Sequence, residues 1–299
     1  MIGNIVLLHI SDLHIEIEDS KNRGAKTNIE KLAKFIDEKE KTTTDRFLIL
    51  ITGDIGDNAK ADELNKFLQI LEANHIDDRI IFVPGNHDAC HLGNEIGATT
   101  FDENAVKHYQ LLQACLLNRC RQFITTAIDN QAQIDIRSIT CDPFIKGKFL
   151  FWNKTSKVKC TARIFEYTNR KIIFVLVDSN PQNVMFSINF AQGEIGKKQI
   201  KAIKDIGTNS KYNGWLKAVL LHHHPIYNNY FLKLKDSAEF LQAIWDTFSI
   251  VCFGHKHAAN CWSSHAGNMS AAPAFFESGL VYRYTISPNN TIGFDYFQV

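Results

Sequence analysis

Five short apolar runs in this sequence each end in a cluster of aspartate, asparagine or histidine residues, and this arrangement restricts the folds open to the chain. The runs cover residues 5–9, 47–52, 80–83, 218–221 and 250–253. Their length and composition are typical of buried β-strands. Helical patterns lie between them, which indicates an α/β fold with a largely parallel sheet. Ligands of such sheets bind beyond the carboxyl ends of the strands, so we expect the polar clusters to lie along one rim.

Apolar periodicity predicts the remaining elements. Thr27 and Glu30 fit a capping box at the start of a helix whose apolar face runs to Ile36. Further helices are expected at 64–71, 102–128, 192–206 and 240–248, and further strands at 157–166, 171–178 and in the alternating tail after Val281. The stretch 134–153 carries no clear period and is expected to be irregular.

Size and charge limit the class of protein. The chain has 299 residues, of which 45% are hydrophobic, enough for one α/β domain with a sizeable core. We expect a single domain over 1–299, with a helical and irregular cap-like insertion at about 92–156. The net charge of +1 gives no general affinity for nucleic acid. Seven cysteines without C-x-x-C spacing favour reduced thiols and a cytoplasmic location. No apolar run reaches the ~18 residues that a membrane helix needs, so no membrane association is expected.

The polar clusters carry the side chains of a metal site. They are Asp12 with His14, Asp54 with Asp57, Asn86 with His87 and Asp88, His222 with His223 and His224, and His255 with His257. These five strand ends hold seven of the 12 histidines, which polar capping of strands does not explain. Alternate side chains of an extended segment point the same way, so Asp12 and His14 are expected to reach one point. Mixed nitrogen and oxygen ligands suit manganese, iron or zinc better than calcium.

The motif series resembles the calcineurin-like metallophosphoesterase superfamily. D-x-H, G-D-x-x-D, G-N-H-D, H-H-P and G-H-x-H follow in this order between Asp12 and His257. The resemblance implies a four-layer α/β/β/α sandwich of two mixed β-sheets, with a dinuclear metal site at the strand ends. It also implies a metal-dependent phosphoric ester hydrolase. Two divalent or trivalent metal ions would clamp the phosphate and acidify a bridging water, whose hydroxide attacks phosphorus.

The resemblance also assigns ligands by motif position. Asp12, His14 and His257 correspond to ligands of the first metal. Asn86, His223 and His255 correspond to ligands of the second metal, and Asp54 bridges both with one oxygen for each. The ligand of the H-H-P motif is the histidine two before the proline, which is His223, although the preceding His222 leaves the register open.

Residues next to these ligands receive roles in the reaction. His87 resembles the non-ligand histidine beside the leaving group, and Asp88 is its expected orienting partner. An imidazole oriented by a carboxylate suits general acid catalysis near neutral pH. Asn86, His87 and His91 are expected to contact the substrate. Asp57 is expected to support a ligand histidine from behind.

Departures from the motifs of particular branches limit the choice of branch within the superfamily. Asn58 and Asp88 stand where protein Ser/Thr phosphatases carry arginine and glutamate, and Asp57 stands where purple acid phosphatases carry tyrosine. The sequence 192–194 (Gln-Gly-Glu) followed by Gln199 is similar to the class III cyclic-nucleotide phosphodiesterases, as is 177–179 (Val-Asp-Ser). We therefore expect hydrolysis of a phosphodiester, with cyclic nucleotides among the candidates.

Three alternatives remain open. The first is a nuclease similar to the double-strand-break repair nucleases, and the second is a phosphomonoesterase of the same superfamily. The third is a non-catalytic scaffold similar to the retromer subunit of this fold, which has lost ligands that this chain retains. The expected partner is a small phosphodiester or nucleotide, nucleic acid is less favoured, and the oligomeric state is open. The 92–156 segment is expected to shape substrate choice without supplying metal ligands.

Overall fold

Two β-sheets form the centre of the molecule. The computed structural model describes residues 3–58, 60–88, 103–145, 157–180, 192–227 and 232–299. One sheet has the strand order β12-β11-β1-β2-β3, and the other has the order β4-β5-β6-β7-β8-β10-β9. The strands of the first sheet are β1 (Ile5–Ile10), β2 (Arg46–Thr52), β3 (Ile80–Val83), β11 (Leu280–Ile286) and β12 (Ile292–Gln298). Those of the second are β4 (Ile134–Ile145), β5 (Lys157–Tyr167), β6 (Ile172–Leu176), β7 (Leu216–Leu220), β8 (Ile250–Phe253), β9 (Asn260–Ser263) and β10 (Asn268–Ala271).

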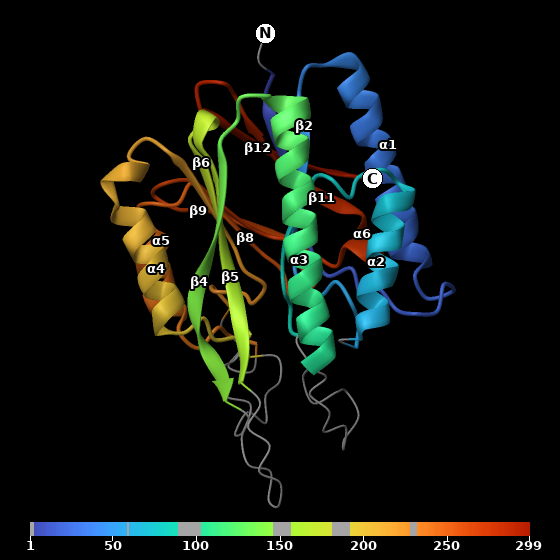
Figure 1. Cartoon of the computed structure of the whole chain (residues 1–299), viewed down its shortest axis with the longest axis horizontal. Helices are drawn as coiled ribbons and strands as arrows, with labels where there is room; N and C mark the ends of the chain where they lie inside the picture. The colour runs from blue at the N-terminus through green and yellow to red at the C-terminus, as the bar shows by residue number, and fades with distance from the viewer. Residues whose placement is uncertain (1–2, 59, 89–102, 146–156, 181–191, 228–231) are drawn as a thin grey trace, which may run out of the picture.

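Helices cover the outer faces of both sheets (Figure 1). They are α1 (Arg23–Thr42), α2 (Ala61–Ala73), α3 (Glu103–Phe123), α4 (Lys197–Thr208), α5 (Ser237–Ile244) and the short α6 (Phe275–Ser278). Both sheets are mixed. In the first, β1–β2 and β2–β3 are parallel pairs, whereas β1–β11 and β11–β12 are antiparallel pairs. In the second, β6–β7, β7–β8 and β8–β10 are parallel pairs, whereas β4–β5, β5–β6 and β9–β10 are antiparallel pairs. The predicted α/β/β/α sandwich of two mixed sheets is confirmed.

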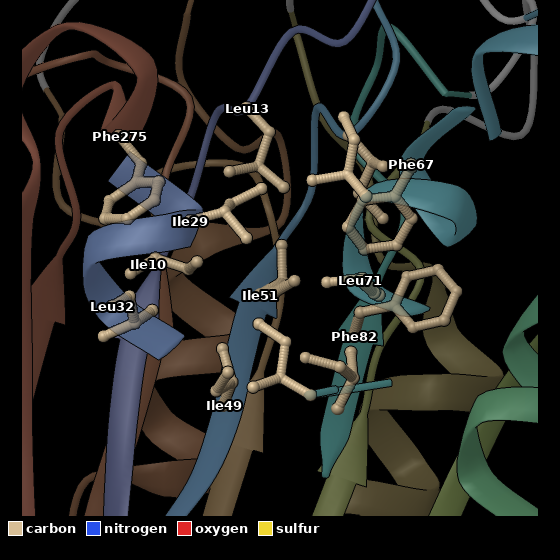
Figure 2. Packing of buried hydrophobic residues seen from close by; sticks show 14 of the residues in the cluster. Ile10, Leu13, Ile29, Leu32, Ile49, Ile51, Phe67, Leu71, Phe82 and Phe275 are labelled. Carbon is tan, nitrogen blue, oxygen red and sulfur yellow. The ribbon is translucent and has the colours of Figure 1, made fainter. Parts of the chain in front are cut away.

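Strand alternation divides the core into three apolar layers. In β1, Ile5 and Leu7 face the opposite sheet, whereas Leu8 and Ile10 face the helices. Because both faces are covered, every residue of β1 is buried, which explains its unbroken apolar run. Figure 2 shows the outer layer of the first sheet, where Ile10 and Leu13 meet helix α1 and Phe82 meets helix α2. A third layer joins the second sheet to α4 and α5.

The described part of the expected cap belongs to the sandwich. Helix α3 buries Leu112 and Leu116 in the outer layer of the first sheet. It also buries Leu117 and Cys120 between the two sheets. Residues 134–145, expected to be irregular, form the edge strand β4 instead. Residues 89–102 and 146–156 lie outside the described residues. Helix α3 and strand β4 thus pack within the sandwich, and a cap-like role for the 92–156 segment stays a prediction.

Local chemistry explains further differences from the sequence predictions. Helix α1 begins at Arg23, so Thr27 lies within it and the predicted capping box is not its start. Helix α4 begins at Lys197 rather than 192, because Gly196 has a φ of +85° and the Asp236 carboxylate accepts hydrogen bonds from the amides of Ile195 and Gly196. The pair β9–β10 was not predicted because its strands are short. Among the described helices, none is long and apolar enough to span a membrane.

Candidate metal centre

The predicted ligands gather at the carboxyl ends of β1, β2, β3, β7 and β8. Their convergence depends on backbone turns rather than on extended chain. Among the described residues, eight non-glycine residues have positive φ, and five of them are predicted ligands: Asp12, His14, Asp54, His255 and His257. Such conformations are unfavourable for most residues and cluster at functional sites. The expectation that Asp12 and His14 meet through strand alternation was therefore right about the meeting and wrong about its cause.

The first cluster consists of Asp12, His14 and His257, whose ligand atoms all lie within 4.8 Å of one another. The Nε2 atoms of His14 and His257 are 3.2 Å apart, and His257 Nε2 is 3.3 Å from Asp12 Oδ1. His14 Nδ1 donates to Asp57 Oδ1 at 3.1 Å, which directs the lone pair of the neutral ring to Nε2. Asp12 is fully buried, and its Oδ2 accepts the backbone amide of His255 at 3.1 Å.

The second cluster surrounds His222. Its Nε2 lies 3.0 Å from Asn86 Oδ1, 3.1 Å from His255 Nδ1 and 3.2 Å from Asp54 Oδ2. Its Nδ1 donates to the carbonyl oxygen of Thr52 at 2.7 Å, so Nε2 is again the nitrogen that faces the cluster. Burial by itself would lower the pKa of His222, but the adjacent Asp54 carboxylate raises it to about 9.

Asp54 lies between the two clusters. Its Oδ2 is 3.2 Å from His222 Nε2 and 4.0 Å from His14 Nε2. Its Oδ1 accepts the backbone amide of His87 at 2.8 Å. Burial favours the neutral acid, but the neighbouring histidines, His222 first among them, hold the pKa of Asp54 well below its usual range. The same oxygen therefore faces both clusters, whereas the sequence suggested one oxygen for each metal.

The residues fit two metal ions. The buried Asp12 Oδ1 has no hydrogen-bond partner within the described part of the chain. Around His222 Nε2 lie two oxygen acceptors, Asn86 Oδ1 and Asp54 Oδ2, and a ring nitrogen of His255, and Nε2 can offer them at most one proton. A cation placed among these nitrogen and oxygen atoms would satisfy all of them. Neutral imidazoles with carboxylate and amide oxygens suit manganese, iron or zinc.

His223, the predicted ligand of the second metal, lies in a different environment. Its Nδ1 is 2.9 Å from Ser179 Oγ, and a Cβ added to Gly193 would lie 2.3 Å from its ring. His222 takes the place among Asp54, Asn86 and His255. The His223 ring lies beside His255, with centroids 4.7 Å apart, but it is His222 whose ligand atom groups with those of Asp54 and His255. We therefore propose His222 as the ligand in place of His223.

The two histidines can be compared directly in metal binding. We expect His222→Ala to lose the metal of the second cluster, since it removes the nitrogen at the centre of that cluster. His223→Ala, a matched neighbour, should retain two metal equivalents because His223 is bonded to Ser179 instead. Elemental analysis after reconstitution with manganese measures both. Retention of two equivalents by His222→Ala together with loss in His223→Ala would restore the original assignment.

Glycines in the motifs make room for the carboxylates. A Cβ at Gly85 would lie 2.0 Å from Asp54 Oδ1, and a Cβ at Gly254 would lie 1.9 Å from Ser11 Oγ and 2.6 Å from Asp12 Oδ2. Close approach of backbone to a side chain is one of the physical reasons for glycine. The glycines of G-N-H-D and G-H-x-H are therefore explained by packing against the two buried aspartates.

We expect Gly85→Ala to displace Asp54 and to reduce bound metal below two equivalents. Gly293→Ala is the control, because a Cβ there meets its nearest neighbour, Thr285 Cβ, at 3.7 Å, an ordinary contact. Metal content and melting temperature of both variants test this. Two full equivalents in Gly85→Ala would show that the loop adjusts without moving the carboxylate.

His87 is partly exposed beside the first cluster. Its ring lies edge-on to His14 with centroids 4.7 Å apart, and its Nδ1 donates to the carbonyl oxygen of Asp57 at 2.7 Å. The sequence suggested that Asp88 orients His87, but this prediction is not met among the described contacts of the two residues. The buried Asp88 carboxylate instead accepts the backbone amides of Ile55, Gly56 and Gly85 and joins the β2 and β3 loops. His91 lies outside the described residues.

Two neighbours of the site escaped sequence reasoning. Phe276 of α6 lies edge-on to His14 and His257, with ring centroids 5.5 Å and 6.3 Å away. Phe276 belongs to none of the sequence motifs, because α6 follows the last of them, G-H-x-H. Ser179, noticed only as part of a branch motif, accepts the amides of His222 and His223 at 3.3 Å and 3.1 Å. It holds the backbone of the histidine loop.

Comparison with known proteins agrees with this site. The family model for calcineurin-like phosphoesterases matches residues 5–259. The chain belongs to the calcineurin-like phosphoesterase family. This membership supports a metal-dependent phosphoric ester hydrolase. Comparison with curated protein sequences gave no match.

Solved structures share the fold at low sequence identity. A candidate 5′-nucleotidase from Staphylococcus aureus aligns with 99% of this chain and 54% of its own (TM-score 0.52, 10% identity). GAP50, the anchor in the inner membrane complex of Plasmodium, aligns with 99% of this chain and 85% of its own (TM-score 0.52, 12% identity). The sulfate thiohydrolase SoxB from Thermus thermophilus aligns with 98% of this chain and 56% of its own (TM-score 0.51, 11% identity). The chain thus spans about half the length of the Staphylococcus and Thermus proteins.

Proposed function

We propose that this chain is a dinuclear-metal-dependent phosphodiesterase. The observation that carries the proposal is the position of Asp54 Oδ2, which faces a cluster of Asp12, His14 and His257 on one side and of Asn86, His222 and His255 on the other. Two metal ions, when bound, neutralise a phosphoryl group and acidify water near neutral pH.

The chain's own residues prepare this site before any substrate binds. Asp57 and the Thr52 carbonyl fix the tautomers of His14 and His222. Asp12 Oδ2 and Asp54 Oδ1 accept the backbone amides of His255 and His87, which ties each ligand loop to a carboxylate. Such preorganisation means that little reorganisation is needed at the moment of reaction.

His87 favours a diester with a poor leaving group. The bond from Nδ1–H to the Asp57 carbonyl sets the ring and directs Nε2 away from this partner. In our proposal the imidazolium form gives its Nε2 proton to the departing alkoxide oxygen as the P–O bond breaks, which leaves the neutral Nδ1–H ring. His87 is thus proposed as the general acid, with the Asp57 carbonyl in the orienting role first given to Asp88.

The class III motif residues support cyclic nucleotides as substrates. Ser179 and Gly193 contact His223 and its backbone, and Gln199 binds the amide and carbonyl of Asp178. Ser179 and Gly193 thus pack against the loop of residues 222–224 that follows β7. A nucleoside monophosphate is the second candidate substrate, favoured by the fold shared with the Staphylococcus nucleotidase. A non-catalytic scaffold role is the third candidate function, because the fold is also shared with the Plasmodium anchor protein.

A substrate panel tests the proposal. Manganese-loaded protein is assayed with bis-p-nitrophenyl phosphate, p-nitrophenyl phosphate, 3′,5′-cyclic nucleotides, nucleoside monophosphates and single-stranded DNA. We expect the highest kcat/KM on a diester. Preference for monoesters would support the nucleotidase alternative, and cleavage of DNA with salt-dependent binding would support the nuclease. Less than one metal equivalent and no hydrolysis would support the scaffold.

A further inference from the structure

A buried polar network lies between the two sheets directly behind the metal centre. His9 Nδ1 is 2.7 Å from Ser270 Oγ, and His9 Nε2 is 2.9 Å from Thr52 Oγ1. The Tyr284 hydroxyl donates to Ser270 Oγ at 2.7 Å. His9, Thr52, Ser270 and Tyr284 are all buried. Their neighbours in the same layer are apolar, so the network stands out chemically.

The network joins both sheets at one point. His9 lies in β1, Thr52 ends β2 and Tyr284 lies in β11, all in the first sheet, whereas Ser270 lies in β10 of the second sheet. Burial lowers the pKa of His9 to about 3, so the ring is neutral and carries one donor and one acceptor. Two hydroxyl partners can satisfy either tautomer. The polar groups are therefore paired, and the network links β1, β2 and β11 of the first sheet to β10 of the second.

Thr52 connects this network to the metal centre. Its side chain binds His9, while its carbonyl oxygen accepts Nδ1–H of His222 at 2.7 Å and the Ser11 hydroxyl at 3.0 Å. Thr52 is the last residue of β2, and Gly53 follows with a φ of +92°. Strand β2 ends at Thr52, and the backbone amide of Asp12 donates to the Gly53 carbonyl at 3.0 Å just beyond it. The side-chain anchors of Thr52 therefore act together with this backbone contact in holding the Thr52 peptide.

We infer that His9 is a positioning residue for His222, acting through Thr52 to fix the tautomer and orientation of the imidazole at the second cluster. This inference rests on the proposed metal centre. Partners of metal-binding histidines typically change metal affinity ~10–100-fold when removed. His9 is one residue further away, so we expect an effect at the lower end, about tenfold.

Matched variants separate this role from general packing. His9→Gln places an amide near the position of Nε2 and keeps a partner for Thr52 Oγ1, whereas His9→Asn reaches only the position of Nδ1 beside Ser270. Thr52→Val removes the hydroxyl and keeps both the volume and the carbonyl. We expect His9→Asn and Thr52→Val to weaken the binding of one of two manganese ions about tenfold and His9→Gln to restore it. Melting temperatures identify any variant whose fold has changed.

A second measurement does not require metal. In the metal-free protein, ¹⁵N NMR of the histidine rings reports which nitrogen of His222 carries the proton. Because the pKa of His222 is raised to about 9, the spectra are recorded above that pH, where the ring is neutral. We expect a single Nδ1–H tautomer in the wild type and in His9→Gln, and a mixture in Thr52→Val and His9→Asn. Unchanged tautomer and metal affinity in Thr52→Val would overturn the inference. Failure of the wild type to bind two ions would refute the proposed metal centre, while the NMR comparison would still decide the role of His9.

Discussion

Replacement of Asp54 by alanine is expected to remove both metal ions and essentially all phosphoesterase activity. Oδ2 of Asp54 faces both clusters, and Asp54 supplies the carboxylate that groups with the ligand atoms of His222 and His255. Loss of metal forfeits several kcal/mol of transition-state stabilisation, so we expect a decrease of ~10³-fold or more in kcat/KM. Elemental analysis and kinetics on bis-p-nitrophenyl phosphate measure the two effects.

Two further variants control this experiment. Asp54→Asn keeps the volume and an oxygen acceptor for the His87 amide while removing the charge, so it should fold normally and still lose metal. Asp62→Asn removes an exposed carboxylate of α2 and should bind two ions. If Asp54→Asn retained both ions with full activity, the clusters would bind metal independently and Asp54 would not bridge them.

Replacement of His87 by alanine is expected to retain both metals and to lose ~10²–10⁴ in kcat, the usual range for general acid catalysis. His87 contacts the Asp57 carbonyl and lies beside His14, but it is not a member of either of the two clusters that share Asp54. The loss should be smaller on p-nitrophenyl esters than on alkyl diesters, because p-nitrophenolate leaves without a proton. Kinetics on both substrate types, with metal analysis, test this.

The outcomes distinguish three roles for His87. Equal losses on both leaving groups would mean that His87 only positions the phosphate. Loss of a metal ion would make His87 a ligand, which its proximity to His14 and Asp57 allows geometrically. His265→Ala, at an exposed position in the β9–β10 turn, is the control and should change neither metal content nor kcat.

The site also shows how far the order of motifs predicts chemistry. Five apolar runs ending in polar clusters led to an α/β fold with a polar rim, since burial on both faces forces a strand to be apolar until it leaves the sheet. The motifs at their ends led to the family, and that resemblance implied the sandwich. The choice between His222 and His223 was beyond sequence reasoning. Adjacent side chains diverge, and the direction of each depends on backbone angles that the positive φ values around this site make irregular.

What the sequence by itself determined is which strand ends carry the candidate metal ligands, because such ligands come from a few residue types and these stand where the buried strands stop. The tertiary structure alone decided which atoms converge. It assigned Asp88 to the loop amides rather than to His87, and it packed α3 and the edge strand β4 within the sandwich. It also joined His9 to His222 through Thr52. These contacts link residues far apart in the chain, and a sequence pattern records local periodicity but not which distant side chains share a hydrogen bond.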